Sequence, residues 1–207
     1  MKIPTPCTLN GRLVLLEPLS VAHARDLFAS FAEDPTIWRW LPISPPSSEA
    51  EMHAGIDVHL KRQAAGEALA FAQVSVATGR AVGVTNYLSI TVADGGLEVG
   101  GTWLGKRAQR TGINREAKYL LLRHAFEALG AFRVQLKTDA RNEQSQRAIA
   151  RLGAVREGVL RKHKLCWDGF IRDSVLFSVI DSEWPAVKSA LEATVLTGAP
   201  PPDSRSS

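Results

Sequence analysis

The segment from Glu98 to Ser145 constrains the fold of this chain more than any other. It contains, in order, a predicted strand, a basic loop with one glycine, a long predicted helix, a second predicted strand, and then an asparagine and a serine. The Gly100-Gly101 pair in the first strand predicts a bulge or a close approach of another backbone or a ligand, which would leave N–H groups unpaired. Alternation of side chains predicts two faces, with Leu97, Val99 and Trp103 on one and Glu98, Thr102 and Leu104 on the other.

A helix follows the basic loop that ends at Gly112, which we call the glycine loop. Apolar residues recur at helical spacing from Asn114 to Leu129, so the helix should begin near Gly112 and end at Gly130. The open N–H groups and the positive dipole end of such a helix suit a phosphate, although most glycines before a helix only make a turn. The basic residues that should surround this helix start are Lys106, Arg107, Arg110 and Arg115.

The spacing of Glu98, of Gln109-x-x-Gly112 and of Asn142 resembles the GNAT superfamily of acyl-CoA-dependent N-acyltransferases. Within that superfamily, Asn142-x-x-Ser145 with the later Arg151-Leu152-Gly153-Ala154 and Glu157-Gly158 most resembles the RimJ/RimL-type amine acetyltransferases, such as ribosomal-protein-alanine acetyltransferases. The resemblance covers roughly residues 10 to 185. The chain departs from the family at Asn114, where the pyrophosphate loop usually ends in Gly or Ala and where Asn could instead cap the helix.

The resemblance implies two catalytic residues. Glu98 would remove a proton from the attacking amine, through a water molecule, and Ser145 would protonate the leaving thiolate. Many GNAT members use a Tyr one turn after this serine, where this chain has Ile149. The competing interpretations are an exposed strand glutamate for Glu98 and ordinary helix-start chemistry for Ser145 and Asn142.

The resemblance also implies an acetyl-CoA site. Backbone N–H groups around Trp103 and Leu104 would contact the thioester oxygen and the pantetheine arm, and the Asn142 amide would hold the arm. The basic residues of the following helix give a separate expectation: Arg141, Arg147 and Arg151 would reach phosphate, unless they are simply solvated surface arginines. The diphosphate would bind at a loop made of Gln109, Arg110, Thr111, Gly112, Ile113 and Asn114.

The acceptor should be a primary amine that is neutral when it attacks. Neutralising an α-amine of pKa about 7.8 at pH 7 costs about 1 kcal/mol, whereas a lysine of pKa about 10.4 costs about 4.6 kcal/mol. This favours a peptide N-terminus or another α-amine. Two interpretations fit the aromatic segment with Trp38, Trp40 and Leu41. The resemblance suggests that these residues line the acceptor pocket, but we favour the interpretation that they pack helices against the sheet as a staple.

Three functions from different classes are compatible with the sequence. The leading one is an acetyl-CoA-dependent N-acetyltransferase that acts on a protein N-terminal α-amine or a small-molecule amine. The alternative is a catalytically inactive CoA-binding protein of GNAT fold. An RNA-binding module, or any direct nucleic-acid binding, is disfavoured because the aromatic residues do not interleave with the basic clusters.

The rest of the chain predicts one mixed α/β domain. With 207 residues and 45% hydrophobic content it can form a single core over residues 1–196, and the Pro- and Ser-rich segment 197–207 should be a disordered tail. The predicted element order is β-α-α-β-β-β-α-β-α-β-β. The resemblance implies that these elements form a mostly antiparallel central sheet flanked by helices.

Composition adds few constraints. The formal charge of +4 suits an anionic cofactor but is usually solvated surface. No membrane helix, signal peptide or metal-ligand cluster is predicted, so a cytoplasmic location without a metal is expected. Cys7 and Cys166 should be reduced thiols. A homodimer is compatible with the sequence.

Overall fold

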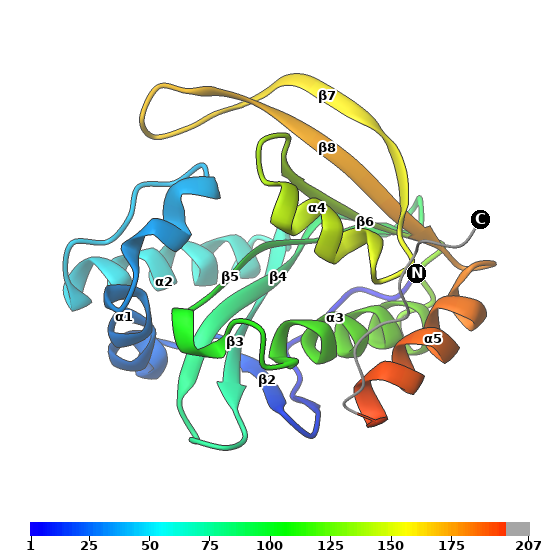
Figure 1. Ribbon diagram of the computed structural model, residues 1–207, viewed down its shortest axis with the longest axis horizontal. Helices are drawn as coiled ribbons and strands as arrows, with labels where there is room; N and C mark the ends of the chain where they lie inside the picture. The colour runs from blue at the N-terminus through cyan, green and yellow to red at the C-terminus, as the bar shows by residue number, and fades with distance from the viewer. Residues whose placement is uncertain (198–207) are drawn as a thin grey trace.

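The computed structural model describes residues 1–197, so the predicted disordered tail lies outside the described residues except for its first position. Eight strands form one sheet in the order β1-β2-β3-β4-β5-β6-β8-β7, and helices cover both of its faces (Figure 1). The predicted mixed α/β architecture, with its mostly antiparallel sheet, is confirmed. The strands are β1 (Leu9–Asn10), β2 (Val14–Pro18), β3 (Ala68–Ser75), β4 (Ala81–Thr91), β5 (Gly96–Leu104), β6 (Arg133–Asp139), β7 (Val155–Leu165) and β8 (Ile171–Ile180).

The helices follow the predicted order with short additions. The first strand, predicted over residues 11–19, is β2, and the two-residue β1 that precedes it was not predicted. The long central helix ends in a π-helical turn, η4 (His124–Ala128). The α-helices are α1 (Ala24–Ala32), α2 (Glu49–Ala64), α3 (Ile113–Arg123), α4 (Glu143–Ala150) and α5 (Trp184–Thr197), and the 3-10 helices are η1 (Val21–His23), η2 (Pro35–Trp40) and η3 (Lys106–Ala108).

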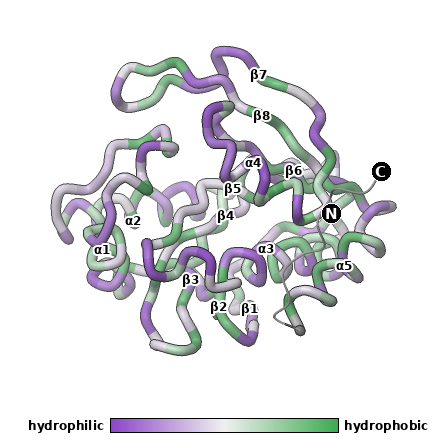
Figure 2. The backbone as a smooth tube through the Cα atoms, viewed as in Figure 1, coloured by the Kyte–Doolittle hydropathy of each residue, from purple (hydrophilic) through white to green (hydrophobic). Residues whose placement is uncertain are grey.

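Two apolar cores lie on opposite faces of the sheet. The larger contains residues of α3, α4 and α5, and the smaller contains residues of α1, α2 and η2. Trp38 is buried in the smaller core between Phe31 and Trp103, with ring centroids 5.2 Å from each, so the staple interpretation of this aromatic segment is confirmed for Trp38. Hydrophilic residues gather instead on connecting loops, including the one that leads into α3 (Figure 2).

The predicted bulge is present, and it corrects the predicted faces of β5. Gly101 has a φ of +57°, and the register with β4 shifts at this point. Because one extra residue reverses the alternation beyond it, Trp103 joins the smaller core, whereas Leu104 joins Leu97 and Val99 in the larger one. The assignment of Trp103 to the face of Leu97, and of Leu104 to the face of Glu98, was therefore wrong.

Strands β5 and β6 create an opening in the sheet. They are the only parallel neighbours among the strands described, and they pair only from Gly96 to Glu98 on β5. Beyond Glu98 no β6 residue pairs with β5. Helices α3 and α4 follow these two strands, and the carboxyl ends of neighbouring parallel strands are common ligand sites in α/β proteins.

A buried lysine lies beneath the bulge. Lys118, on α3, is 6% exposed, and its Nζ donates hydrogen bonds to the hydroxyls of Thr85 and Thr102. Burial lowers the pKa of Lys118 to about 7, and the nearby charge of Glu98 opposes that shift. A group of this kind is largely neutral at slightly alkaline pH, when it no longer carries the cost of a buried charge.

Replacing Lys118 by Met should change how stability depends on pH. Between the folded pKa of about 7 and the unfolded pKa of about 10.4, the unfolded chain binds more protons, so this lysine makes stability rise with pH. From pH 6 to pH 10, wild type should gain roughly 4 kcal/mol of unfolding free energy relative to Lys118→Met. Urea unfolding across this range measures the difference. The exposed Lys61→Met serves as control, and parallel curves for wild type and Lys118→Met would contradict the assignment.

Candidate active site

The start of α3 has the geometry of an anion site. Helix α3 begins at Ile113, as predicted, after Gly112, which has a φ of +92° and occupies the N-cap without any side-chain cap. A Cβ at Gly112 would lie 2.9 Å from Cδ1 of the exposed Leu13 side chain, which can move, so it is the positive φ that favours glycine at this position. The first N–H groups of a helix have no intrahelical acceptor and are therefore available to a ligand.

A buried carboxylate fixes α3 against β2. Glu116, one turn into the helix, accepts hydrogen bonds from the backbone N–H groups of Arg12, Leu13 and Val14 at 2.9, 2.6 and 3.0 Å. Charge-assisted bonds of this kind are stronger than neutral ones. The helix start is thereby held on the rigid sheet.

The side chains of the glycine loop shape the loop itself. Gln109 Nε2 donates to the Leu104 carbonyl at 3.1 Å, and the Thr111 hydroxyl donates to the Ala108 carbonyl at 2.7 Å. Arg110 is exposed, with a φ of +62°, and Ile113 is buried in the larger core. Asn114 is the second residue of α3, so the interpretation of Asn114 as the cap is wrong because Gly112 holds that position.

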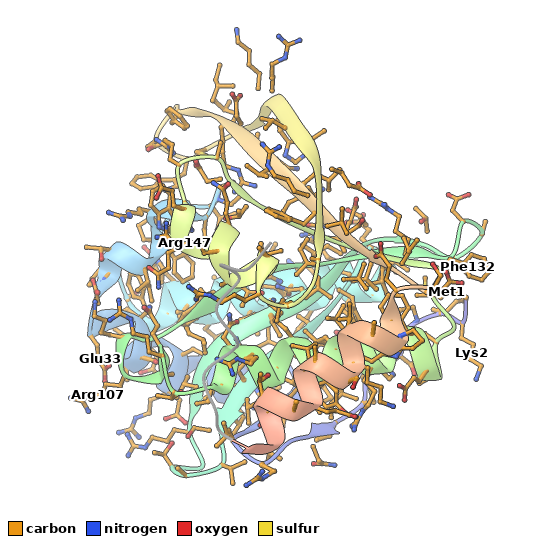
Figure 3. The ribbon with its side chains drawn as sticks, turned by 45° about the vertical axis from the view of Figure 1, so that its right-hand side comes forward. Met1, Lys2, Glu33, Arg107, Phe132 and Arg147 are labelled. Atoms are coloured by element: carbon orange, nitrogen blue, oxygen red, sulfur yellow. The ribbon has the colours of Figure 1, made fainter. Side chains whose placement is uncertain are left out.

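Two of the four basic residues form ion pairs with carboxylates that follow α1. Lys106 Nζ pairs with Asp34 at 3.1 Å, and Arg107 Nε pairs with Glu33 at 3.3 Å, beyond the end of α1. Figure 3 shows Glu33 and Arg107 close together at the edge of the molecule. The prediction that four cations surround the phosphate site is therefore corrected for these two.

Asn142 and Ser145 meet at the start of α4. Asn142 Oδ1 accepts a hydrogen bond from the Ser145 N–H at 3.0 Å, as the helix-start interpretation predicts. The Asn142 amide N–H₂ and the half-buried Ser145 hydroxyl make no hydrogen bond within residues 1–197. Arg147 forms an exposed ion pair with Glu143 at 3.0 Å, and it is labelled in Figure 3 on α4. Its contact with phosphate stays a prediction.

Glu98 is buried and paired. It is 7% exposed, Lys137 Nζ lies 2.9 Å from its Oε2, and the Ser89 hydroxyl donates to the same oxygen at 3.4 Å. The interpretation of Glu98 as an exposed strand residue is therefore wrong. Lys137 lies on β6, so this ion pair joins the two strands just where their pairing ends.

The side chains of Trp103 and Leu104 are core residues. Both are 7% exposed, and the Trp103 carbonyl accepts a hydrogen bond from Gln73 Nε2 at 3.2 Å. Any contact that these two residues make with a ligand must therefore come from their backbone N–H groups. Ile149 is likewise buried in the larger core, so a tyrosine there would overpack the core.

The structure brings most predicted site residues to one opening. Glu98 lies at the last paired position of β5, and the glycine loop and the start of α4 follow the carboxyl ends of β5 and β6. Sequence reasoning missed Lys137 and Lys118. Alternation in β6 could have placed Lys137 opposite the apolar Val134 and Leu136, and Lys118 interrupts the apolar stripe of α3.

Other site types find no support among residues 1–197. No group of three or more His, Cys, Asp or Glu side chains is placed to hold a metal ion. Cys7 and Cys166 are both free thiols, as expected. No helix in this part of the chain has the length and apolar composition that crossing a membrane requires.

Comparison with known proteins gives a consistent result. A family model described as "Acetyltransferase (GNAT) domain" matches residues 12–155. A GCN5-related N-acetyltransferase from Brucella melitensis is 33% identical, with a TM-score of 0.87 over 95% of this chain and 88% of its own. A protein of T. thermophilus, described as a candidate acetyltransferase, is 41% identical, with a TM-score of 0.84 over 93% of this chain and 98% of its own.

A more distant similarity concerns the fold alone. The ribosomal-protein-S5-alanine acetyltransferase from Vibrio fischeri is 21% identical, with a TM-score of 0.71 over 86% of this chain and 98% of its own. No curated protein sequence matches the chain.

Proposed function

The chain belongs to the GNAT family of acetyltransferases, and on that premise we propose that it transfers an acetyl group from acetyl-CoA to a primary amine. The observation that carries the proposal is the glycine-capped start of α3 beside the opening between β5 and β6. We propose further that residues 1–196 form a single acetyltransferase domain and that the protein works in the cytoplasm.

The residues at the opening fit acetyl-CoA. The positive φ of Gly112 and the lack of a side chain leave room for a diphosphate against the N–H groups of the loop from Gln109 to Asn114. The Asn142 amide N–H₂ would hold the pantetheine arm, and backbone N–H groups near Trp103 and Leu104 would bind the thioester oxygen. GNAT domains use acetyl-CoA as the acyl donor, which supports this assignment.

The proposed reaction is a direct attack of the amine on the thioester carbonyl. A C–N bond forms and the C–S bond breaks, with one proton leaving the amine and one reaching sulfur. Glu98 accepts the amine proton, directly or through a water, and Lys137 holds the carboxylate in place. The Ser145 hydroxyl donates to the departing sulfur. A thiolate with a pKa near 8.5 can leave almost unaided, so this contribution should be modest.

The acceptor is proposed to be an α-amine, either a protein N-terminus as in RimJ/RimL-type enzymes or a small molecule. The lower cost of neutralising an α-amine supports this choice over lysine. A catalytically inactive CoA-binding protein is the alternative. A transfer assay with acetyl-CoA and a panel of N-terminal peptides, amino acids, polyamines and aminoglycosides distinguishes the two.

Gly112→Asp should abolish tight binding of CoA. The new carboxylate would stand against the diphosphate, and like charges in contact cost several kcal/mol, so affinity should fall by more than about 30-fold. Isothermal titration calorimetry measures the change. Gly130→Asp is the matched control, because Gly130 also has a positive φ, +70°, but lies beyond the far end of the same helical segment. Unchanged affinity in a folded Gly112→Asp protein would remove the loop from the site.

Glu98→Gln should lower kcat by roughly a hundredfold or more and leave acetyl-CoA affinity intact, because the amide cannot accept the amine proton. Steady-state kinetics as a function of pH would report the loss of the basic group. The exposed Glu67→Gln should behave as wild type. A Glu98→Gln enzyme that keeps both the rate and the pH profile would exclude Glu98 as the base.

A further inference from the structure

Arg172, on β8, is a buried cation that forms no ion pair within 4.0 Å in residues 1–197. It is 8% exposed, its Nε donates to the Ser174 hydroxyl at 2.9 Å, and its Nη1 donates to the Trp40 carbonyl at 3.2 Å. Both acceptors are neutral. Burying a guanidinium whose hydrogen-bond partners are all neutral is costly, and a bound anion would lower that cost.

The neighbouring acidic groups are already engaged. Asp139 binds Arg141, with Oδ2 and Nη2 2.8 Å apart, and Glu98 binds Lys137. Against the opposing effect of burial, hydrogen bonds from Arg141 and the charges of Arg141 and Arg172 lower the pKa of Asp139, so this one carboxylate is shared by two guanidinium groups. Lys164, on β7, is directly opposite Arg172 in the strand register. Like charges opposite each other destabilise a strand pair, and a bound anion between them would remove that repulsion.

The hydroxyl of Ser174 orients a further donor. Ser174 is fully buried, and its oxygen accepts from Arg172 Nε, which can only donate. His163 Nδ1 lies 3.0 Å from the same hydroxyl, and we assign the tautomer in which the hydroxyl donates to Nδ1, because its oxygen already accepts from Arg172. Neutral His163 then carries its own proton on Nε2. Burial, together with the charges of Lys137, Lys164 and Arg172, lowers the pKa of His163, against a smaller opposing effect of Glu98, and favours this neutral form.

This cluster lies on the face of the sheet where Glu98 lies. Ser174 is opposite Asp139 on β6, two residues from Lys137, and the side chains of Lys137 and Asp139 alternate with the core residue Leu136. The β7–β8 hairpin extends above the sheet toward η2 (Figure 1), and the Trp167 N–H donates to the Pro42 carbonyl at 3.1 Å. The donors of Arg172 and His163 thus belong to the acceptor side of the proposed site.

We propose that the amine acceptor carries a carboxylate, which Arg172 binds with the help of Lys164 and the Nε2–H of His163. This inference rests on the proposed acetyl transfer and adds the chemical class of the acceptor. The competing explanation is structural, in which Arg172 only ties the hairpin to η2. That explanation predicts lower stability on mutation but no discrimination between acceptors.

Matched acceptor pairs test the proposal. The first pair is leucine and leucinamide, and the second is a peptide with an N-terminal Met-Asp and its Met-Asn counterpart, so the two pairs separate a free α-carboxylate from an acidic side chain. In wild type the carboxylate member of at least one pair should have a kcat/KM about tenfold or more above its amide. Arg172→Gln should raise KM for that member roughly 10- to 100-fold and leave the neutral member unchanged.

Two further variants make the result decisive. Arg161→Gln, an exposed arginine on β7, is the control and should keep the wild-type preference. Lys164→Gln, at an exposed site, should weaken the preference even if Arg172→Gln does not fold. Two results would overturn this inference without affecting the proposed function. One is equal kcat/KM within both pairs in wild type, and the other is a preference that survives both Lys164→Gln and Arg172→Gln. No transfer to any acceptor, together with no binding of acetyl-CoA, would overturn the proposed function on which it rests.

Discussion

The one extra residue at Gly101 is the constraint on which the rest of the site depends. It shifts the register between β4 and β5 and reverses the faces of everything that follows on β5. Trp103 therefore packs with Trp38 against α1 and α2, while Thr102 turns to Lys118 on the opposite side. The same strand separates from β6 after Glu98, so the bulge and the opening lie within a few residues of each other. An ordinary alternating strand would instead extend the sheet and bury the N–H groups that the proposed thioester site needs.

The buried charged side chains described here, apart from Arg172, either have a bonding partner that compensates the charge or lose the charge. Glu98 has Lys137, Asp139 has Arg141, and Glu116 has three backbone N–H groups. Lys118 avoids the cost of burial by losing its charge near pH 7. Arg172 stays protonated and hydrogen-bonds only neutral groups, and the carboxylate that its charge reaches, Asp139, is already paired with Arg141. Within residues 1–197, Arg172 is therefore a buried cation whose counter-charge is shared, and this excess of positive charge supports an anionic group beside it.

The order of elements, the helix start at Gly112 and the bulge could be predicted because each has a local signal of two or three residues. The faces of Trp103 and Leu104 could not, since two adjacent glycines are compatible with a bulge but do not show that a residue is inserted. The partners of Lys106 and Arg107 lie beyond the end of α1, far along the chain, and loop composition says nothing about them. The pairing of Glu98 depends on Lys137 in the next strand and on Ser89 in the preceding one. The pairing of Lys106, Arg107 and Glu98 depends on contacts between segments that are distant in the sequence. The residue pattern of a single segment cannot predict such contacts.

In the proposed reaction, the acetyl donor and the amine acceptor bind on opposite faces of the sheet. Helices α3 and α4 pack on one face and start at the opening, where the donor would bind, whereas Glu98 and Arg172 belong to the face beneath α1, α2 and the β7–β8 hairpin. Acetyl transfer then requires the two substrates to meet through the gap between β5 and β6, with Glu98 at its edge. Because the acceptor side is built from the hairpin and η2, its side chains can change without disturbing the glycine loop. Acceptor choice in a fold of this kind should therefore be sought in the cross-strand pairs of the hairpin rather than in the loop that resembles the family.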